Sequence, residues 1–218
     1  MPEALILAFD TSAAHCAAAL LHGDTLIAAC FEPMEKGQAE RLMPLLQDLL
    51  AGAGLGWRDL SALAVGTGPG NFTGVRIAVS AARGLALALA VPCIGVTRFD
   101  ALGHGLPRPL AVVEDARRGE AYAAQLAPPG QGIAPHLAPL SALAATLTAP
   151  MLIGTAAEAL AALLPCPATV LPPACPLAEA IARVARTRLD RPHPRPAPFY
   201  LRAADAAPPS DPPPVILR

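Results

Sequence analysis

A loop rich in glycine has a composition that suits anion binding. Residues 66–70 read GTGPG and lie between an apolar strand pattern at 61–65 and a helical pattern that starts at Asn71. Backbone N–H groups at the N-terminus of a helix are good donors to phosphate. The loop lacks the Lys-Ser/Thr pair that completes a P-loop. We therefore expect its glycines mainly to let the strand and the helix pack closely.

The histidines and cysteines lack the spacings typical of a metal site or a redox site. No two histidines stand at i, i+3 or i, i+4, and there is no HExxH motif, which argues against a metallopeptidase. The cysteines are odd in number and include no CxxC pair, which favours buried thiols in a reducing compartment. These residues are His15, His22, His104, His136 and His193, with Cys16, Cys30, Cys93, Cys166 and Cys175.

The first hundred residues contain the elements that would position this loop. Apolar runs at 5–9, 16–21 and 25–30, separated by polar turns, predict an antiparallel meander. Leucines then recur at i, i+3, i+4, i+7 and i+8, which predicts an amphipathic helix over 39–50. Since proline is tolerated in the first turn of a helix, we expect this helix to begin just before Pro44.

The helix predicted over 72–90 is apolar on nearly all sides. Its polar exceptions, Arg76, Ser80 and Arg83, fall on one stripe. A helix of this composition must be covered on several sides, and two arginines argue against a membrane span. We expect it to be buried in a domain, or to be covered half by its own domain and half by another protein.

The second half of the chain repeats the order of the first. A strand at 110–113 ends in acidic residues, with Asp115 in the place of Asp10, and a polar turn leads to a second strand at 120–126. Residues 151–155 again run from an apolar strand into glycine before a helix. This repetition predicts an internal duplication.

Composition shifts divide the chain into three parts. We expect an N-terminal lobe over 1–105, a smaller C-terminal lobe over 106–204 and a proline-rich flexible tail over 205–218. A last helix is predicted over 177–189, followed by an extended segment at 191–198.

Charge and composition narrow the class of protein. The 218 residues carry a net charge of −1, and aromatic residues make up 4%, so nothing in the composition attracts nucleic acid generally. The start of the chain, Met1-Pro2-Glu3, lacks the basic region of a signal peptide. We expect a cytoplasmic protein that does not associate with membranes.

Four ordered blocks resemble the TsaB family, also called YeaZ, and the resemblance runs from residue 5 to residue 202. The blocks are Asp10-Thr11-Ser12, the GTGPGNFTGVR run at 66–76, the DARRGEAY run at 115–122, and Phe199-Tyr200-Leu201-Arg202. The family has the duplicated actin/Hsp70/sugar-kinase-like (ASKHA, ribonuclease H-like) fold. The resemblance therefore implies an α/β protein of two lobes with the second lobe reduced.

The resemblance also implies a function. Members of the family are non-catalytic subunits of the bacterial machinery that makes N6-threonylcarbamoyladenosine beside the anticodon of tRNAs reading codons that start with A. They pair with the catalytic paralogue TsaD, help to recruit the ATPase TsaE, and form a homodimer when TsaD is absent. By this resemblance the chain would bind no cofactor or metal, would have no catalytic residue, and would meet tRNA only through the complex.

In this family the two helices at 39–50 and 72–90 form the dimer face. Burial in the protein's own core is the alternative role for each residue of these helices. The interface residues that the resemblance implies are Leu42, Leu45, Leu46, Leu49, Val75, Arg76, Val79, Ala82 and Arg83.

Active relatives of this fold bind nucleotide phosphates near the turn that follows the first strand. A vestigial nucleotide site here would comprise Asp10, Thr11, Ser12, Gly68 and Gly70. We favour the simpler interpretation that the Asp-Thr-Ser turn caps its own backbone, because the second half lacks the Gly-Thr of a second phosphate hairpin. A degenerate ATPase or a peptidase is the rival function.

Arginines gather near the C-terminus, where a solvated helix is the simple interpretation and contact with tRNA phosphate the alternative. They are Arg183, Arg186, Arg188, Arg191, Arg195 and Arg202.

Overall fold

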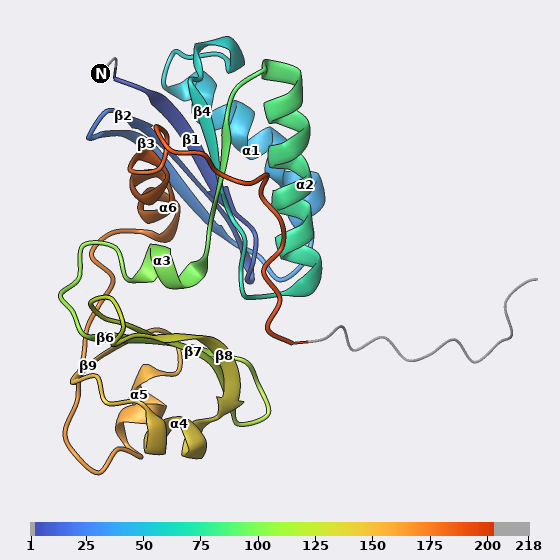
Figure 1. Ribbon diagram of the computed structural model, residues 1–218. Helices are drawn as coiled ribbons and strands as arrows, with labels where there is room; N and C mark the ends of the chain where they lie inside the picture. The colour runs from blue at the N-terminus through green and yellow to red at the C-terminus, as the bar shows by residue number, and fades with distance from the viewer. Residues whose placement is uncertain (1–2, 203–218) are drawn as a thin grey trace, which may run out of the picture.

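The computed structural model describes residues 3–202 and arranges them in two lobes, one above the other in Figure 1. Each lobe is built on a five-stranded sheet, and the first has the strand order β3-β2-β1-β4-β5. Its strands are β1 Leu5–Asp10, β2 His15–His22, β3 Thr25–Pro33, β4 Ala62–Gly66 and β5 Cys93–Val96. Strands β1 to β3 pair antiparallel, which confirms the predicted meander, and β4 and β5 continue the sheet in parallel with β1.

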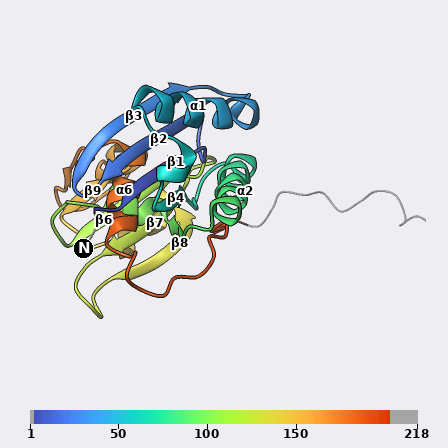
Figure 2. The same ribbon diagram turned by 90° about the horizontal axis from the view of Figure 1, so that it is seen from above.

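The first sheet is covered on both faces, as Figure 2 shows from above. Helices α1 Gln38–Gly52 and α2 Phe72–Leu89 pack on one face, and α6 Leu177–Arg186 packs on the other. Strand β1 is therefore buried along its whole length: Leu7 contacts the α1 and α2 side, and Ile6 contacts the α6 side. The short helix η1 Trp57–Asp59 leads into β4.

The second sheet repeats the first, with the order β10-β9-β6-β7-β8 and the same pattern of parallel and antiparallel pairs. This confirms the predicted duplication. Its strands are β6 Leu110–Asp115, β7 Glu120–Leu126, β8 Ile133–Pro139, β9 Met151–Ile153 and β10 Thr169–Val170. Helices α4 Leu140–Thr146 and α5 Ala157–Ala161 cover one face, while α3 Arg98–Leu102 supplies Phe99 and Leu102 to the other.

The start of α1 differs from the prediction. The helix begins at Gln38 after Gly37, whose φ is 92°, so Pro44 lies inside the helix and not in its first turn. Pro44 is exposed to solvent. Its missing N–H removes one helical hydrogen bond, which is tolerated because Leu42, Leu45 and Leu46 bury the opposite side of the helix against the sheet.

The boundary between the lobes also needs correction. The predicted second lobe, 106–204, does not stay together, because α6 packs against β1, β2 and β4 of the first sheet. Its buried side chains, among them Ile181 and Val184, complete the first core. The second lobe therefore ends before α6, and the chain returns to the first lobe (Figure 1).

After α6 the chain crosses the junction of the lobes. It is extended at 191–198, as expected, and the N–H of Phe199 donates to the carbonyl of Thr67 at 2.8 Å. Phe199 packs edge-on against Phe99, and Tyr200 stacks on Phe72 of α2 with ring centroids 4.9 Å apart. The proline-rich tail predicted over 205–218 lies outside the described residues.

Candidate functional site

A buried polar cluster lies where the two lobes meet, at the end of β1. Asp10, which is 2% exposed, accepts hydrogen bonds from the N–H and the hydroxyl of Ser12 at 2.9 and 2.8 Å. Its Oδ1 also lies 2.9 Å from Nε2 of His15. The Asp-Thr-Ser turn thus caps its own backbone, as the simpler interpretation of the sequence predicted.

Arg98 links this cluster to the second lobe. Its side chain forms an ion pair with Glu114 at the end of β6 and donates to the hydroxyl of Ser12 at 3.5 Å. Glu114 in turn accepts from the N–H of Thr155 at 2.9 Å. Because Arg98 and Glu114 have side chains only 15% and 7% exposed, the pair is shielded from bulk water.

These surroundings shift the ionisation of Asp10. Burial raises the pKa of its carboxyl group, but the hydrogen bond to His15, the charges of Arg98 and His15, and the N–H of Ser12 outweigh it and hold the pKa below its usual range. Such a group stabilises the fold above its pKa in the unfolded chain, and this contribution is lost as the pH falls through the lowered pKa.

We therefore expect acid unfolding to depend on Asp10. As the pH falls below about 4, the free energy of unfolding should drop more steeply in the wild type than in Asp10→Asn. Urea unfolding measured at a series of pH values checks this. Asp115→Asn is the matched control, since Asp115 occupies the equivalent place in the second lobe but is exposed. An equal acid dependence in Asp10→Asn and the wild type would contradict the assignment.

The glycine loop packs directly against the Asp-Thr-Ser turn. A Cβ added to Gly66 would lie 1.9 Å from Oδ2 of Asp10, and one added to Gly70 would lie 2.3 Å from the carbonyl oxygen of Ser12. The N–H of Gly74 is already used, because it donates to the side chain of Asn71 at 2.9 Å. The close packing predicted for these glycines is confirmed.

The structure brings the five residues of the suggested nucleotide site together, but most of them are buried and bond to other groups of the protein. Asp10, Thr11, Ser12 and Gly68 are buried. The hydroxyl of Thr11 donates to the carbonyl of Gly74 at 2.6 Å, and Ser12 accepts the N–H of Asn71 at 2.6 Å through its carbonyl. In this arrangement the hydroxyls of Thr11 and Ser12 and the N–H of Asn71 donate to groups of the fold itself. Gly70 alone of the five is exposed.

Most of the proposed interface residues lie in the core, which corrects their assignment to a contact surface. Leu42, Leu45, Leu46, Val75, Val79 and Ala82 are each at most 2% exposed. They face the first sheet, because the helices must bury one apolar side against it. Leu49 is partly buried against the same core, and Arg76 and Arg83 are exposed on α2.

The outer side of α2 carries a different set of residues, which we call the α2 face. Leu87 is 83% exposed, and at the start of the helix the guanidinium of Arg76 lies 3.7 Å from the ring centre of Phe72. Arg76 also donates to the hydroxyl of Tyr200 at 2.8 Å. The α2 face comprises Phe72, Arg76, Ser80, Arg83, Gly84, Leu87 and Ala88 with Tyr200.

Sequence reasoning missed Phe72, Leu87 and Tyr200 as surface residues. For Leu87 the signal was present: the stripe of Arg76 and Arg83 reaches Leu87 after one more turn of the helix. Phe72 and Tyr200 are far apart in the sequence, so their contact could come only from the structure.

By length and composition alone, α2 is long and apolar enough to cross a bilayer, and it is the one such helix in the described residues. Within the fold, 28% of that stretch is buried. A single helix of this kind is weak evidence for a membrane span. What the fold shows directly is an apolar helix with one side on the sheet and the other uncovered.

Ion pairs occupy most of the C-terminal arginines, which favours the interpretation as a solvated surface. Arg183 pairs with Glu179 at 2.7 Å, Arg188 pairs with Asp100 at 2.9 Å, Arg186 pairs with Asp24, and Arg202 pairs with Glu120. Residues 3–202 also contain no group of three His, Cys, Asp or Glu side chains that could hold a metal ion.

Two lobes that repeat one sheet topology and meet at the ends of β1 and β6 define the actin-like ATPase class of fold. Two solved structures share this architecture at low sequence identity. One is component A of the Acidaminococcus fermentans (R)-2-hydroxyglutaryl-CoA dehydratase, with a TM-score of 0.53 and 10% identity over 86% of this chain and 100% of that one. The other is EutJ of Carboxydothermus hydrogenoformans, with a TM-score of 0.52 and 12% identity over 84% of this chain and 89% of that one.

Within this class the sequence is more specific. A sequence profile described as "TsaD: tRNA N6-adenosine threonylcarbamoyltransferase" matches residues 32–161. YeaZ from Pseudomonas aeruginosa is 31% identical with a TM-score of 0.69, over 85% of this chain and 92% of that one. The Escherichia coli tRNA threonylcarbamoyladenosine biosynthesis protein TsaB is 41% identical over 126 residues, 55% of this chain and 54% of that protein. The chain belongs to the TsaB/YeaZ family, and its match spans about half the length of the curated TsaB relatives.

Proposed function

We propose that this protein takes part in making N6-threonylcarbamoyladenosine in tRNA, as a non-catalytic subunit that pairs with a TsaD-type protein through the α2 face. Family membership supports the pathway, because curated relatives from Escherichia coli and Bacillus subtilis are named tRNA threonylcarbamoyladenosine biosynthesis proteins. The pair would recruit TsaE and would work in the cytoplasm. In the absence of TsaD, two copies of this chain would pair through the same face.

The exposure of Leu87 is the observation that carries the proposal. An isolated leucine that is 83% exposed contributes nothing to its own core, whereas burying it against a partner is worth about 1.5–3 kcal/mol. The stacked Phe72, Arg76 and Tyr200 add aromatic and arginine groups, which are the residue types enriched at the centres of interfaces. Small residues between these two ends, among them Ser80 and Gly84, let another helix approach closely.

The proposed role needs no side-chain chemistry from this chain. The acidic and hydroxyl groups of the buried polar cluster, Asp10, Ser12 and Glu114, already bond to protein groups. This favours a scaffold over the rival ATPase. Nucleotide turnover by the purified chain that disappears in Asp10→Ala would favour the rival instead.

The test is the mass in solution of the protein mixed with the TsaD of the same organism. Leu87→Glu should weaken the pair about a hundredfold, because the carboxylate loses the apolar contact and must be desolvated. Leu163→Glu is the matched control, since Leu163 is an exposed leucine of the second lobe, at 51% exposure. Pairing that survives Leu87→Glu unchanged would show that the α2 face is not the contact surface.

A further inference from the structure

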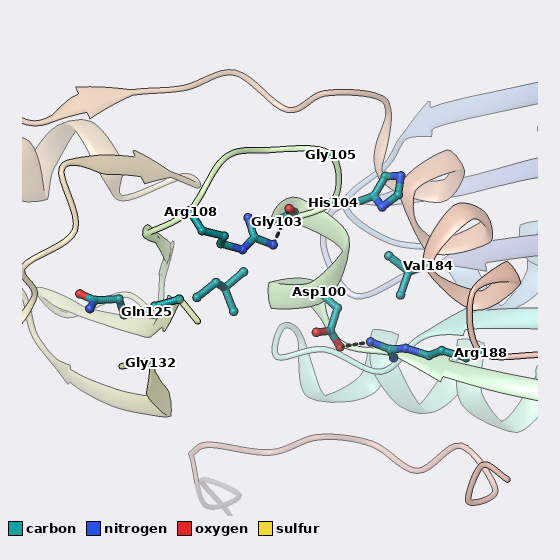
Figure 3. A pocket seen from close by; sticks show the side chains of 11 residues that line it. Asp100, Gly103, His104, Gly105, Arg108, Gln125, Gly132, Val184 and Arg188 are labelled. Atoms are coloured by element: carbon teal, nitrogen blue, oxygen red, sulfur yellow. Dashed lines mark hydrogen bonds and ion pairs between the residues drawn. The ribbon is translucent and has the colours of Figure 1, made fainter. Parts of the chain in front are cut away.

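A pocket of about 410 Å³ lies between the lobes, away from both the buried polar cluster and the α2 face. It is formed by the segment from Asp100 to Arg108, the end of β7, the last turn of α6 and Arg188 just after that helix (Figure 3). None of its lining residues belongs to the Asp-Thr-Ser turn or to α2. Its volume is in the range of sites that bind small molecules.

Two guanidinium groups enter the pocket from opposite sides, as Figure 3 shows. Arg188, two residues after the end of α6, is paired with Asp100 at 2.9 Å. Arg108 donates to the carbonyl oxygens of Gly103 at 2.8 Å, Leu106 at 2.9 Å and Pro107 at 3.5 Å, and within residues 3–202 it forms no ion pair. The pocket therefore holds two permanent positive charges and one carboxylate, which leaves an excess positive charge.

His104 adds a donor that the fold does not use. Its ring is partly buried beside Val184, and within the described part of the chain no group hydrogen-bonds to it (Figure 3). Burial lowers the pKa of His104, and the charges of Arg183 and Arg108 lower it further against the opposite effect of Glu179. The lowered pKa favours the uncharged ring in the free protein.

This set of groups selects the ligand. A planar guanidinium presents several N–H donors in fixed directions and binds the oxygens of a phosphate or similar oxyanion in pairs. An imidazole nearby supplies a further donor and gains a proton readily when a negative charge approaches. Cations are disfavoured by the excess positive charge, and a purely apolar ligand would leave Arg108 and His104 desolvated.

We propose that this interlobe pocket binds a small molecule through a tetrahedral oxyanion, a phosphate or sulfate group, held by Arg108 and His104 while Asp100 keeps Arg188 in place. The remainder of the ligand occupies the space between the end of β7 and α6. Because the pocket is lined by both lobes, a bound oxyanion joins them. The site is independent of the proposed contact with TsaD, since the two share no residue.

Sulfate is the probe, because it stays a dianion throughout the range in which histidine titrates. Its affinity should rise as the pH falls from about 7.5 to about 5.5, since a bound dianion raises the pKa of His104 and proton uptake then accompanies binding. The groups that face His104 and share this field are Arg108, Arg183 and Glu179. In His104→Asn this rise with acidity should be lost.

The measurement is a titration of the full chain with sodium sulfate at constant ionic strength, followed by the backbone NMR signals of Gly103, Gly105 and Gly132. Arg108→Gln should lower the affinity about tenfold or more, the loss expected for a charge-assisted hydrogen bond. Arg58→Gln, the control, removes an exposed arginine outside the pocket and should bind as the wild type does.

Saturable shifts confined to the pocket that weaken in Arg108→Gln alone would support the proposal, and inorganic phosphate should then compete with sulfate. Equal binding by Arg108→Gln and Arg58→Gln, or no saturation by about 50 mM sulfate at the lower pH, would overturn it. Binding of an RNA oligonucleotide with no response to sulfate would also overturn it, because the arginines of the pocket would then contact nucleic acid and not a small oxyanion.

Discussion

Gly74→Ala is expected to destabilise the folded protein by more than about 4 kcal/mol, the range reserved for severe core disruption. A Cβ added to Gly74 would lie 2.0 Å from the carbonyl oxygen of Thr11. This contact is with a backbone atom, which cannot rotate away as a side chain could. The hydroxyl of Thr11 also donates to the carbonyl oxygen of Gly74 at 2.6 Å, which fixes the turn against the helix. Neither side can give way without separating α2 from β1.

The same helix provides the control for this substitution. Gly84 lies in α2 with nothing within 4 Å of an added Cβ. Gly84→Ala should therefore stabilise the protein by up to about 1 kcal/mol, the difference in helix propensity between glycine and alanine. Urea unfolding of both variants measures the contrast. Similar stabilities for Gly74→Ala and the wild type would show that the turn and the helix are not in close contact.

The close packing of Gly66 and Gly70 against the Asp-Thr-Ser turn belongs to the part of the fold that could be predicted from the sequence, whereas the contact at Gly74 could not. The GTGPG loop between an apolar strand and a helical pattern predicts tight packing by its composition alone. The meander and the duplication were predictable for the same reason, since both depend on local patterns of period and turns. These signals need no knowledge of distant contacts.

Predictions that depend on which side of a helix faces which neighbour were less successful. Periodicity marks Leu45 and Val79 as apolar but cannot tell a core contact from a partner contact. The structure assigns both to the core and leaves Leu87 exposed. Likewise, the amphipathic pattern of α6 predicts that this helix covers a sheet but does not say which sheet. Only the structure shows that α6 packs on the sheet of the first lobe.

The buried polar cluster shows a further limit of sequence reasoning. Asp10 is the last residue of β1, and Glu114 comes one residue before the end of the equivalent strand β6, so their acidic character was visible in the sequence. Arg98, which pairs with Glu114 and donates to Ser12 beside Asp10, lies in α3, a short helix that the sequence pattern did not predict. An ion pair between side chains that are distant along the chain leaves no periodic signal, and its energetic weight must be measured.

Arg98→Met is expected to cost about 3–5 kcal/mol, because it leaves the carboxylate of Glu114 buried without its cation. The loss should be much smaller in the double variant Arg98→Met with Glu114→Gln, since glutamine keeps the oxygen that accepts from the N–H of Thr155 and removes the buried charge. Urea unfolding of the wild type, both single variants and the double variant gives the coupling energy between the two positions.

The free energy of unfolding of the same variants, measured as the pH falls, separates an electrostatic role for Arg98 from a role in packing alone. Because the charge of Arg98 helps to lower the pKa of Asp10, its removal should raise that pKa, so the stability lost relative to the wild type should be largest near neutral pH and should shrink as Asp10 is protonated. A packing defect would lower stability equally at every pH. A loss under about 1 kcal/mol with an unchanged dependence on pH would mean that water screens the pair and that the lobes are held mainly by their apolar contacts.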